Sequence, residues 1–291
     1  MAAVIYYINY LLNCYLYKSL PMKSILLLAI CLFTSGVSFS QNFPKGTLKY
    51  EITYDYFFQV NKEDLMGTQT EETVLKIAKD YSIYSSVNNI KLMELTNDLK
   101  QSGIMPEREA IPNTRLNYTV TKNFKNNEMM YSEWIKGDTY MYNQTLDKFN
   151  WKLEEGQREI LGYKCKKATT QFAGRDYIAW YAPGINVTDG PYKFHGLPGL
   201  ILSLYDTNNY YQFNAINIKN SKSFFDTAII AAKPIFLSKA DYATLKKNYR
   251  VKPSSILNTG GIAFPKEFND RADQRAKERL KYENNPLEIN D

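Results

Sequence analysis

Apolar and polar residues alternate strictly where the main part of the chain begins. Over 48–58, one face would carry Leu48, Tyr50, Ile52, Tyr54, Tyr56 and Phe58, and the other face would carry Lys49, Glu51, Thr53 and Asp55. A period of two is typical of a β-strand with one buried and one solvated face. The runs 73–78 and 81–87 predict a hairpin, and the polar stretch 61–72 is expected to form a loop.

The same pattern predicts a series of short strands through the middle of the chain. They are expected at 117–121, 128–135, 139–142, 149–153, 200–205 and 210–218. Turn residues such as Asn126-Asn127 and Gly137-Asp138 separate them, whereas residues 98–113, with Gly103, Pro106 and Pro112, are expected to be irregular. Strands at hairpin spacing favour an antiparallel meander over βαβ units.

The period changes in the C-terminal third. Ser238 is expected to cap a helix that runs to about Arg250, and Pro265 is expected at the first position of a second helix over 265–282. The fold class predicted from the whole pattern is mainly β (α+β), with a single curved antiparallel sheet or half-barrel and two helices near the C-terminus.

The first forty residues form a leader by their composition. Met22 and Lys23 precede an apolar run over 25–33 and a small-residue end at 38–40, which is the layout of a secretory signal peptide. Residues 22–40 are therefore expected to be the signal peptide, and 1–21 are expected to come from a mis-set start codon. The sequence itself leaves both Met1 and Met22 open as the start.

Two alternatives for the leader stay open at this point. One is a single long N-terminal anchor, and the other is lipidation at Cys31. The expected mature chain, 41–291, is a single β domain with no transmembrane span. Its location would be periplasmic, outer-membrane-associated or secreted.

The charge pattern and the small number of histidine and cysteine residues argue against nucleic acid and metal ions as partners. The formal net charge is +6, and the basic residues alternate with acidic ones, so nucleic acid is not an expected partner. The only histidine is His195, and Cys165 is the only cysteine beyond the leader, so no metal site is expected. No Gly-rich nucleotide loop follows a strand, and no cofactor is expected.

One segment, 190–202, concentrates glycine, proline and aromatic residues. Pro198-Gly199 fits the two central positions of a type II turn, which would lead into a central strand that is apolar on both faces. The structural interpretation is a tight, buried entry into that strand. The alternative is a binding mouth lined by Trp180, Tyr192, Phe194 and His195.

Residues 196–201 read GLPGLI, and 160–168 contain a Gly-Tyr-x-Cys sequence. With these motifs the chain resembles the GLPGLI family of secreted proteins of Bacteroidota. The resemblance implies an exported protein without an established activity, and its motif residues are expected to be structural. They are Gly162, Tyr163, Cys165, Gly190, Pro191, Gly196, Leu197, Pro198, Gly199, Leu200 and Ile201.

Three functional hypotheses follow. The first is a non-enzymatic envelope protein, without catalytic residues, that binds an apolar small molecule or an envelope protein on the curved sheet. The second is a secreted hydrolase that uses Cys165 with His195, or a carboxylate site. The third is an accessory subunit of an outer-membrane assembly. Against the hydrolase, Cys165 is expected in the core, and Glu71-Glu72 and Glu154-Glu155 are expected in solvated turns.

Overall fold

A computed structural model describes residues 46–64, 66–135, 138–225, 234–257 and 265–289. All of them belong to one compact unit, Pro44–Asp291. The expected leader and Gly137 lie outside the described residues.

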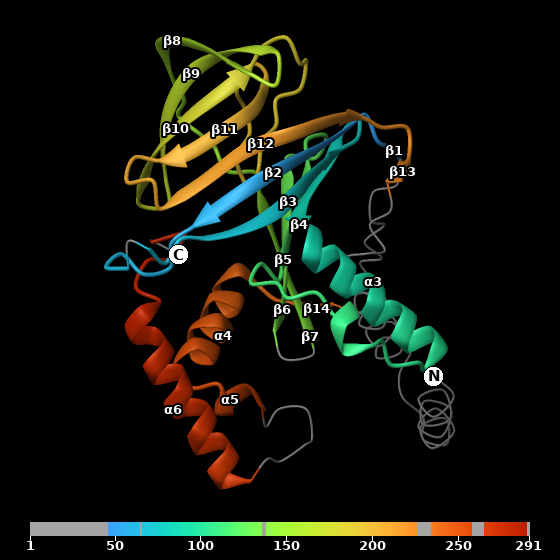
Figure 1. Ribbon diagram of the computed structural model, residues 1–291, viewed down its shortest axis with the longest axis vertical. Coiled ribbons are helices and arrows are strands. Elements are labelled where there is room, and N and C mark those ends of the chain that lie inside the picture. Colours follow the sequence, from blue (N-terminus) through green and yellow to red (C-terminus); the bar gives the residue numbers. More distant parts are fainter. Residues whose placement is uncertain (1–45, 65, 136–137, 226–233, 258–264, 290–291) are drawn as a thin grey trace, which may run out of the picture. The chain divides into compact units, whose positions relative to one another are not determined.

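Twelve strands form one open sheet in the order β14-β7-β6-β5-β4-β3-β2-β12-β11-β10-β9-β8 (Figure 1). Their bounds are β2 (Tyr50–Phe58), β3 (Gln69–Ile77), β4 (Tyr81–Ser86), β5 (Tyr118–Asn123), β6 (Glu128–Ile135), β7 (Asp138–Thr145), β8 (Lys152–Ile160), β9 (Tyr163–Phe172), β10 (Arg175–Ala182), β11 (Leu200–Asp206), β12 (Tyr211–Asn220) and β14 (Ile235–Phe236). Neighbouring strands are antiparallel except for β14 and β7, which are parallel. A separate two-stranded sheet joins β1 (Gly46–Thr47) to β13 (Phe224–Phe225).

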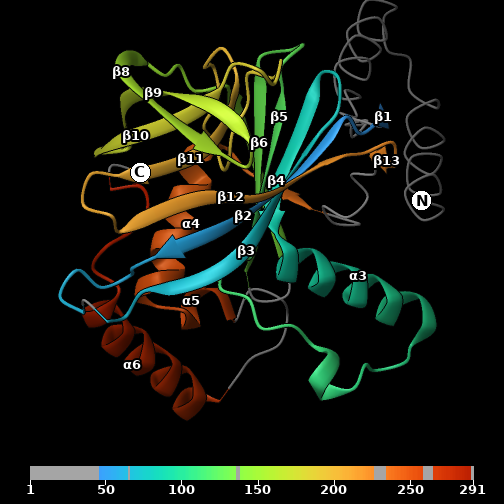
Figure 2. The same cartoon turned by 45° about the horizontal axis from the view of Figure 1, so that its top comes forward.

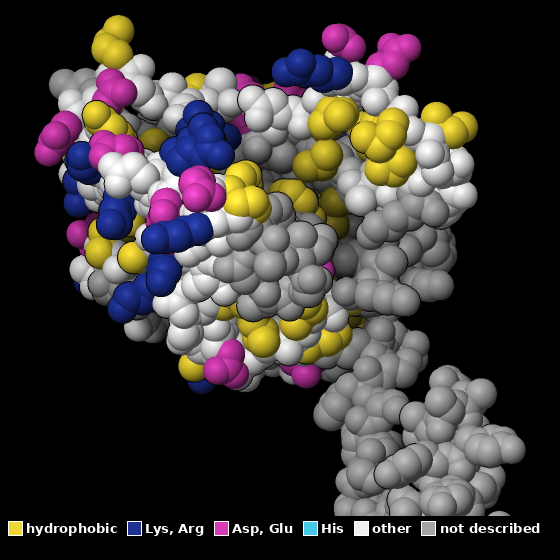
Figure 3. Space-filling model, turned by 90° about the horizontal axis from the view of Figure 1, so that it is seen from below, with side chains coloured by type: hydrophobic (Ala, Val, Ile, Leu, Met, Phe, Trp, Pro, Cys, Tyr) yellow, Lys and Arg dark blue, Asp and Glu magenta, His cyan; other side chains and the backbone are white. Residues whose placement is uncertain are grey.

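The helices are α3 (Val87–Ser102), η1 (Arg108–Ala110), α4 (Lys239–Val251), α5 (Ser254–Leu257) and α6 (Lys266–Tyr282). The predicted fold class, mainly β with helices near the C-terminus, is confirmed. Ser238 caps α4 as expected, because its Oγ accepts a hydrogen bond from the backbone N–H of Asp241 at 3.0 Å. Pro265 lies one position earlier than expected, at the N-cap of α6. Seen from below, basic and acidic side chains are interspersed on the surface (Figure 3).

In the part of the chain that the structure describes, no helix combines the length and the apolar character needed to cross a membrane.

The sequence did not reveal helix α3, and its last turn was wrongly expected to be irregular. The helix lacks a strong apolar stripe, which is the signal that periodicity arguments use. Its ends are nevertheless well defined. The Ser86 hydroxyl accepts from the backbone N–H of Asn89 at 3.2 Å, and Gly103 ends the helix with φ of 70°.

Two strand boundaries also differ from the prediction. Residues 69–72, expected in a loop, are the first part of β3, and β8 runs over 152–160 in place of 149–153. In both segments polar residues occupy both faces of the strand, so alternation between apolar and polar positions is weak. These residues are in strands because they pair with neighbouring strands, and this pairing cannot be seen in the local sequence.

One face of the sheet, called here the inner face, is filled by large apolar side chains. The Phe213 ring stacks on that of Tyr56, with centroids 4.2 Å apart, across the β12–β2 pair. Residues 183–199, between β10 and β11, supply Tyr192, Phe194 and Leu197 to the same hydrophobic core. Strand β11 lies between β10 and β12 and is buried along most of its length, as predicted for a central strand.

The turn before β11 is tighter than the predicted type II turn. The N–H of Gly199 donates to the carbonyl of Leu197 at 2.8 Å, which closes a three-residue turn around Pro198. Gly199 has φ of 151°, and a Cβ at this position would lie 2.4 Å from the carbonyl oxygen of Ala182. Glycine is needed here because two backbone segments almost touch.

Replacing Gly199 by alanine is expected to lower the free energy of unfolding by roughly 2–4 kcal/mol, because the backbone carbonyl of Ala182 cannot move without disturbing β10. Chemical denaturation would measure the loss. Gly184→Ala is the matched control, since a Cβ there meets nothing within 4 Å. Equal stability of the two variants would contradict this account.

Candidate functional site

The four residues of the expected binding mouth do not lie together. Phe194 is fully buried on the inner face, with its ring 4.8 Å from that of Tyr177. Tyr192 is buried nearby, and its hydroxyl donates to Glu288 Oε1 at 2.7 Å. Trp180 projects from the other face of β10, where it lies opposite Lys167. A binding role for these residues stays a prediction, but it would involve two separate places.

His195 lies beside a buried ion pair. Lys122 Nζ is 2.5 Å from Asp189 Oδ1, and both side chains are almost completely excluded from solvent. The same ammonium group donates to the carbonyls of Gly190 at 2.7 Å and Phe194 at 3.1 Å. Asp189 and His195 are paired in an isolated antiparallel bridge. Thus the ion pair fixes the segment that carries His195 against the inner face.

Burial, and after it the charge of the nearby Lys122 ammonium, lowers the pKa of His195 from 6.5 to about 4. Asp189 and the backbone of Asp147 act in the opposite direction and do not overcome burial. The ring contacts Phe124 and Phe149 edge-on, and its Nε2 has no hydrogen-bond partner in the described part of the chain. A neutral imidazole is therefore the favoured form in the folded protein at neutral pH.

Stability should consequently fall as the pH drops from about 6.5 to about 4. In this window the unfolded chain binds a proton at His195 and the folded chain does not, which costs about 1.4 kcal/mol per pH unit and up to roughly 3 kcal/mol in total. Denaturation curves at several pH values would measure the slope. His195→Gln should flatten it, and an unchanged slope in that variant would show that other groups are responsible.

Cys165 is buried in β9, and burial raises the pKa of its thiol. Its Sγ lies 3.5 Å from the carbonyl oxygen of Tyr163, within the same strand. An activated nucleophile needs a lowered thiol pKa and a base within hydrogen-bond reach. The hydrolase hypothesis therefore has no support from Cys165 and His195.

Several motif residues have positions that explain their identity in structural terms. Gly162 has φ of 79° in the turn between β8 and β9, and Gly196 has φ of 92°. A Cβ on Gly190 would lie 2.7 Å from the side chain of Ile201. Pro191, Leu197, Leu200 and Ile201 are buried, Tyr163 is half-buried and Pro198 is exposed.

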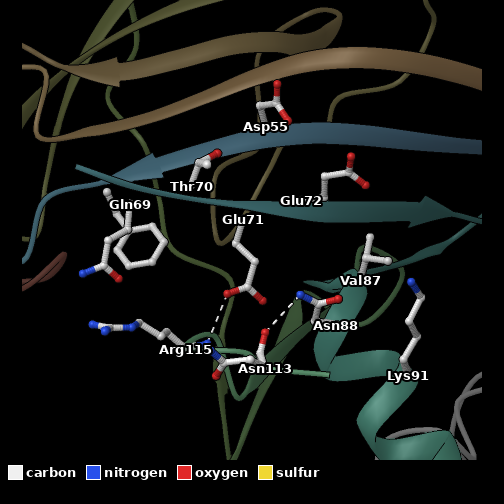
Figure 4. Close-up of a pocket in the computed structure, with 11 residues that line it drawn as sticks. Asp55, Gln69, Thr70, Glu71, Glu72, Val87, Asn88, Lys91, Asn113 and Arg115 are labelled. Atoms are coloured by element: carbon white, nitrogen blue, oxygen red, sulfur yellow. Dashed lines mark hydrogen bonds between the residues drawn. The ribbon is translucent and has the colours of Figure 1, made fainter. Parts of the chain in front are cut away.

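A polar pocket of about 680 Å³ lies at the edge of β3, in a place that the sequence did not indicate. Strand β3 pairs with β2 along its whole length, but it pairs with β4 only from Thr73 onward. The edge of β3 at 69–72 consequently faces the start of α3 across a gap, which is called here the β3 notch (Figure 4). Its lining residues are Asp55, Phe58, Gln69, Thr70, Glu71, Glu72, Val87, Asn88, Lys91, Asn113 and Arg115.

Glu71 fastens one wall of the β3 notch. Its carboxylate accepts hydrogen bonds from the hydroxyl of Ser86, from the hydroxyl of Thr114 at 2.5 Å and from the backbone N–H of Arg115 at 3.1 Å. Asn88 Nδ2 donates to the carbonyl of Asn113 at 3.1 Å. These bonds tie β3, α3 and residues 113–115 together, so the wall is held in place.

Asp55 and Glu72 lie directly opposite each other on β2 and β3, and both point away from Glu71 (Figure 4). Glu72 is exposed and Asp55 is half-buried. The alternation over 48–58 did place Asp55 on the solvated face. The expectation that Glu71-Glu72 form a solvated turn is wrong, because both residues belong to β3.

The notch offers carboxylates, amides and cationic donors, but within the described residues no group of three or more His, Cys, Asp or Glu side chains could hold a metal ion.

A family described as "N-glycanase peptide, N-terminal domain" matches residues 69–246, which run from the start of β3 into α4. The match extends over more than half of the chain. The chain belongs to this family.

Membership of the N-glycanase N-terminal domain family corrects the resemblance to the GLPGLI family, for which the comparisons give no support. The short motif misled because six residues can recur wherever a tight turn enters a buried strand. A search of curated protein sequences gives no match.

Solved structures support the fold of this family member. PNGF-II in space group P21 has a TM-score of 0.52 and 18% identity, and the match covers 70% of this chain and 34% of PNGF-II. PNGF-II in space group C2 gives 0.51 and 19%, covering 70% and 33%. At such identity the likeness shows the fold alone, and the chain spans about a third of the PNGF-II length.

Proposed function

We propose that this chain is a carbohydrate-recognition domain that binds the glycan of a glycopeptide or glycoprotein at the β3 notch. The observation that carries the proposal is the polar pocket itself, in a chain that belongs to a family of N-glycanase N-terminal domains. The family description indicates a glycan as the class of ligand, and the chain spans about a third of PNGF-II.

The chemistry of the β3 notch suits sugar hydroxyl groups. Each hydroxyl both donates and accepts, so a site that binds sugars needs both kinds of partner. Asp55 and Glu72 supply carboxylate acceptors, Lys91 and Arg115 supply cationic donors, and the amide of Asn88 supplies one donor and one acceptor. A volume of about 680 Å³ lies within the usual range for small-molecule sites.

The inner face offers less to a ligand than the notch does. Its aromatic side chains pack against one another and against residues 183–199, so an apolar cavity between Trp180 and Phe194 has no support. Among the described residues, no comparable pocket supports the hypothesis of a protein that binds an apolar ligand. The hypothesis of an outer-membrane accessory subunit has no comparable support either. As part of the proposal, the leader 1–40 directs export, and residues 41–291 act as one domain outside the cytoplasm.

A second candidate function is hydrolysis at the same place. Glycoside hydrolysis uses two carboxyl groups, and Asp55 and Glu72 are a cross-strand carboxylate pair open to the notch. Glu71 is a poorer candidate for proton transfer because both of its carboxylate oxygens are engaged in structural hydrogen bonds.

Binding should be measured by calorimetry with a purified N-glycosylated peptide and with the same peptide lacking its glycan. The double variant Asp55→Asn/Glu72→Gln is expected to bind the glycopeptide at least tenfold more weakly, because two charged acceptors are lost. It should be as stable as the parent or slightly more so, because opposed like charges destabilise a strand pair.

The matched control is Asp138→Asn/Glu128→Gln, which changes two exposed acids on β7 and β6. Mass spectrometry of the incubated glycopeptide separates the two candidates. Glycan release that is lost in the Asp55/Glu72 variant would establish the hydrolase, and binding without release would establish the recognition domain. Equal affinity for the peptide with and without its glycan would overturn both.

A further inference from the structure

Directly opposed residues form a continuous row across seven strands on the outer face of the sheet. This first ladder runs through Thr70, Phe57, Gln212, Tyr205, Ile178, Thr169 and Lys152, on β3, β2, β12, β11, β10, β9 and β8. All seven side chains are exposed or half-buried. Large apolar side chains in such a row remain partly open to solvent and are available for contact.

A second ladder lies beside the first, two residues along each strand. It runs through Glu72, Asp55, Asn214, Ser203, Trp180, Lys167 and Glu154. Side chains two apart on a strand share a face, so the two ladders make one surface. In the second ladder Ser203 is buried, and the other six side chains are exposed or half-buried. Aromatic rings lie there next to amides, hydroxyls and carboxylates.

Among the described residues, helices leave this part of the outer face open. Strands β12, β2 and β3 lie in front of α4 in Figure 2, and none of the labelled helices lies over their near side. Helix α3 packs against β3 and β4, and α4 packs against β7, away from β10, β11 and β12. The ladders are therefore bounded by α3 at the β3 end and by the exposed edge strand β8 at the other end.

Neighbouring side chains hold the contact residues in place. Trp180 Nε1 donates to the hydroxyl of Tyr205 at 3.4 Å, and the guanidinium of exposed Arg158 lies 4.8 Å from the Trp180 ring centroid. Ser203 Oγ and Asn214 Oδ1 are 2.9 Å apart, which fixes the amide. Because these groups are already ordered, a ligand would lose little side-chain entropy on binding them.

The ladders and the β3 notch are continuous. Thr70, Glu72 and Asp55 belong to both, so a molecule seated in the notch meets Phe57 and Gln212 next. With strands about 4.8 Å apart, four steps from β3 to β10 give a length of roughly 19 Å. That length exceeds one sugar ring and fits a chain of several.

We propose that the two ladders form an extended binding track for an oligosaccharide, which runs from the β3 notch across β2, β12 and β11 to Trp180 on β10. Apolar faces of sugar rings pack on Phe57 and Tyr205, and Gln212 and Asn214 exchange hydrogen bonds with the hydroxyls between them. The inference rests on the proposed glycan recognition and names its substrate class: an extended oligosaccharide, of which the notch holds one end.

The test compares glycans of different length with the full protein. The probes are N-acetylglucosamine disaccharide, which fits the notch alone, and a complete glycan released from a glycoprotein. Parent protein should bind the complete glycan at least tenfold more tightly than the disaccharide. Tyr205→Ala and Phe57→Ala should each weaken binding of the complete glycan about five- to tenfold, as loss of one aromatic contact predicts, and should leave binding of the disaccharide unchanged.

Two control variants test whether the loss of any exposed aromatic side chain weakens glycan binding. Trp134→Ala removes an exposed tryptophan on β6, and Tyr282→Ala removes an exposed tyrosine at the end of α6, both away from the ladders. Neither should alter affinity. Gln212→Ala tests the track without removing an aromatic ring, which covers the case in which an aromatic variant fails to fold.

The outcomes separate this inference from the proposed function. If both glycans bind equally well and the ladder variants bind like the parent, the track is overturned and the notch remains. If neither glycan binds, the proposed glycan recognition fails first. If the ladder variants weaken both probes equally, the ladders act through the stability of the notch, and the track is again overturned.

Discussion

The buried ion pair between Lys122 and Asp189 is the constraint on which the inner face depends. Desolvation lowers the pKa of Lys122, whereas the charge of Asp189 and the hydrogen bond to it act in the opposite direction, and two backbone carbonyls also accept hydrogen bonds from the Lys122 ammonium group. Removing either partner would leave an unpaired charge in an apolar interior, which typically costs 3–5 kcal/mol. The pair thereby joins β5 to the distant segment 189–195 and determines where Phe194 lies.

With that segment in place, Tyr192, Phe194 and Leu197 pack on the inner face as part of the hydrophobic core. Arg175 closes its far end by donating to Asp206 Oδ2 at 3.1 Å, to Asn285 Oδ1 at 2.6 Å and to the carbonyl of Leu287 at 3.1 Å, so the C-terminal tail is fastened over the strand ends. Glu288 accepts a hydrogen bond from the Tyr192 hydroxyl and forms an ion pair with Lys193 Nζ. The proposed glycan recognition therefore uses the outer face and its edges.

The sequence supported the fold more fully than the site, for a physical reason. Alternation over 48–58 predicts β2 and places Asp55 in solvent, because period two is a local property of the chain. The notch is not local. It arises because β4 ends at Ser86 while β3 continues back to Gln69, and because Arg115 returns across the gap to meet Glu71. Only strand register reveals that relation.

The same distinction applies to Trp180 and Gly199. The sequence favoured Trp180 as part of a mouth around Phe194, since the two residues are close in the chain and both are aromatic. Register places Trp180 opposite Ser203 on the outer face, whereas Phe194 packs on Tyr177 on the inner face. Gly199 lies where the end of β10 meets the entry to β11. The close approach of these two backbone segments belongs to the packing of the inner face. The conspicuous motif thus belongs to the packed inner face, and glycine at position 199 allows the entry to β11 to lie against the end of β10.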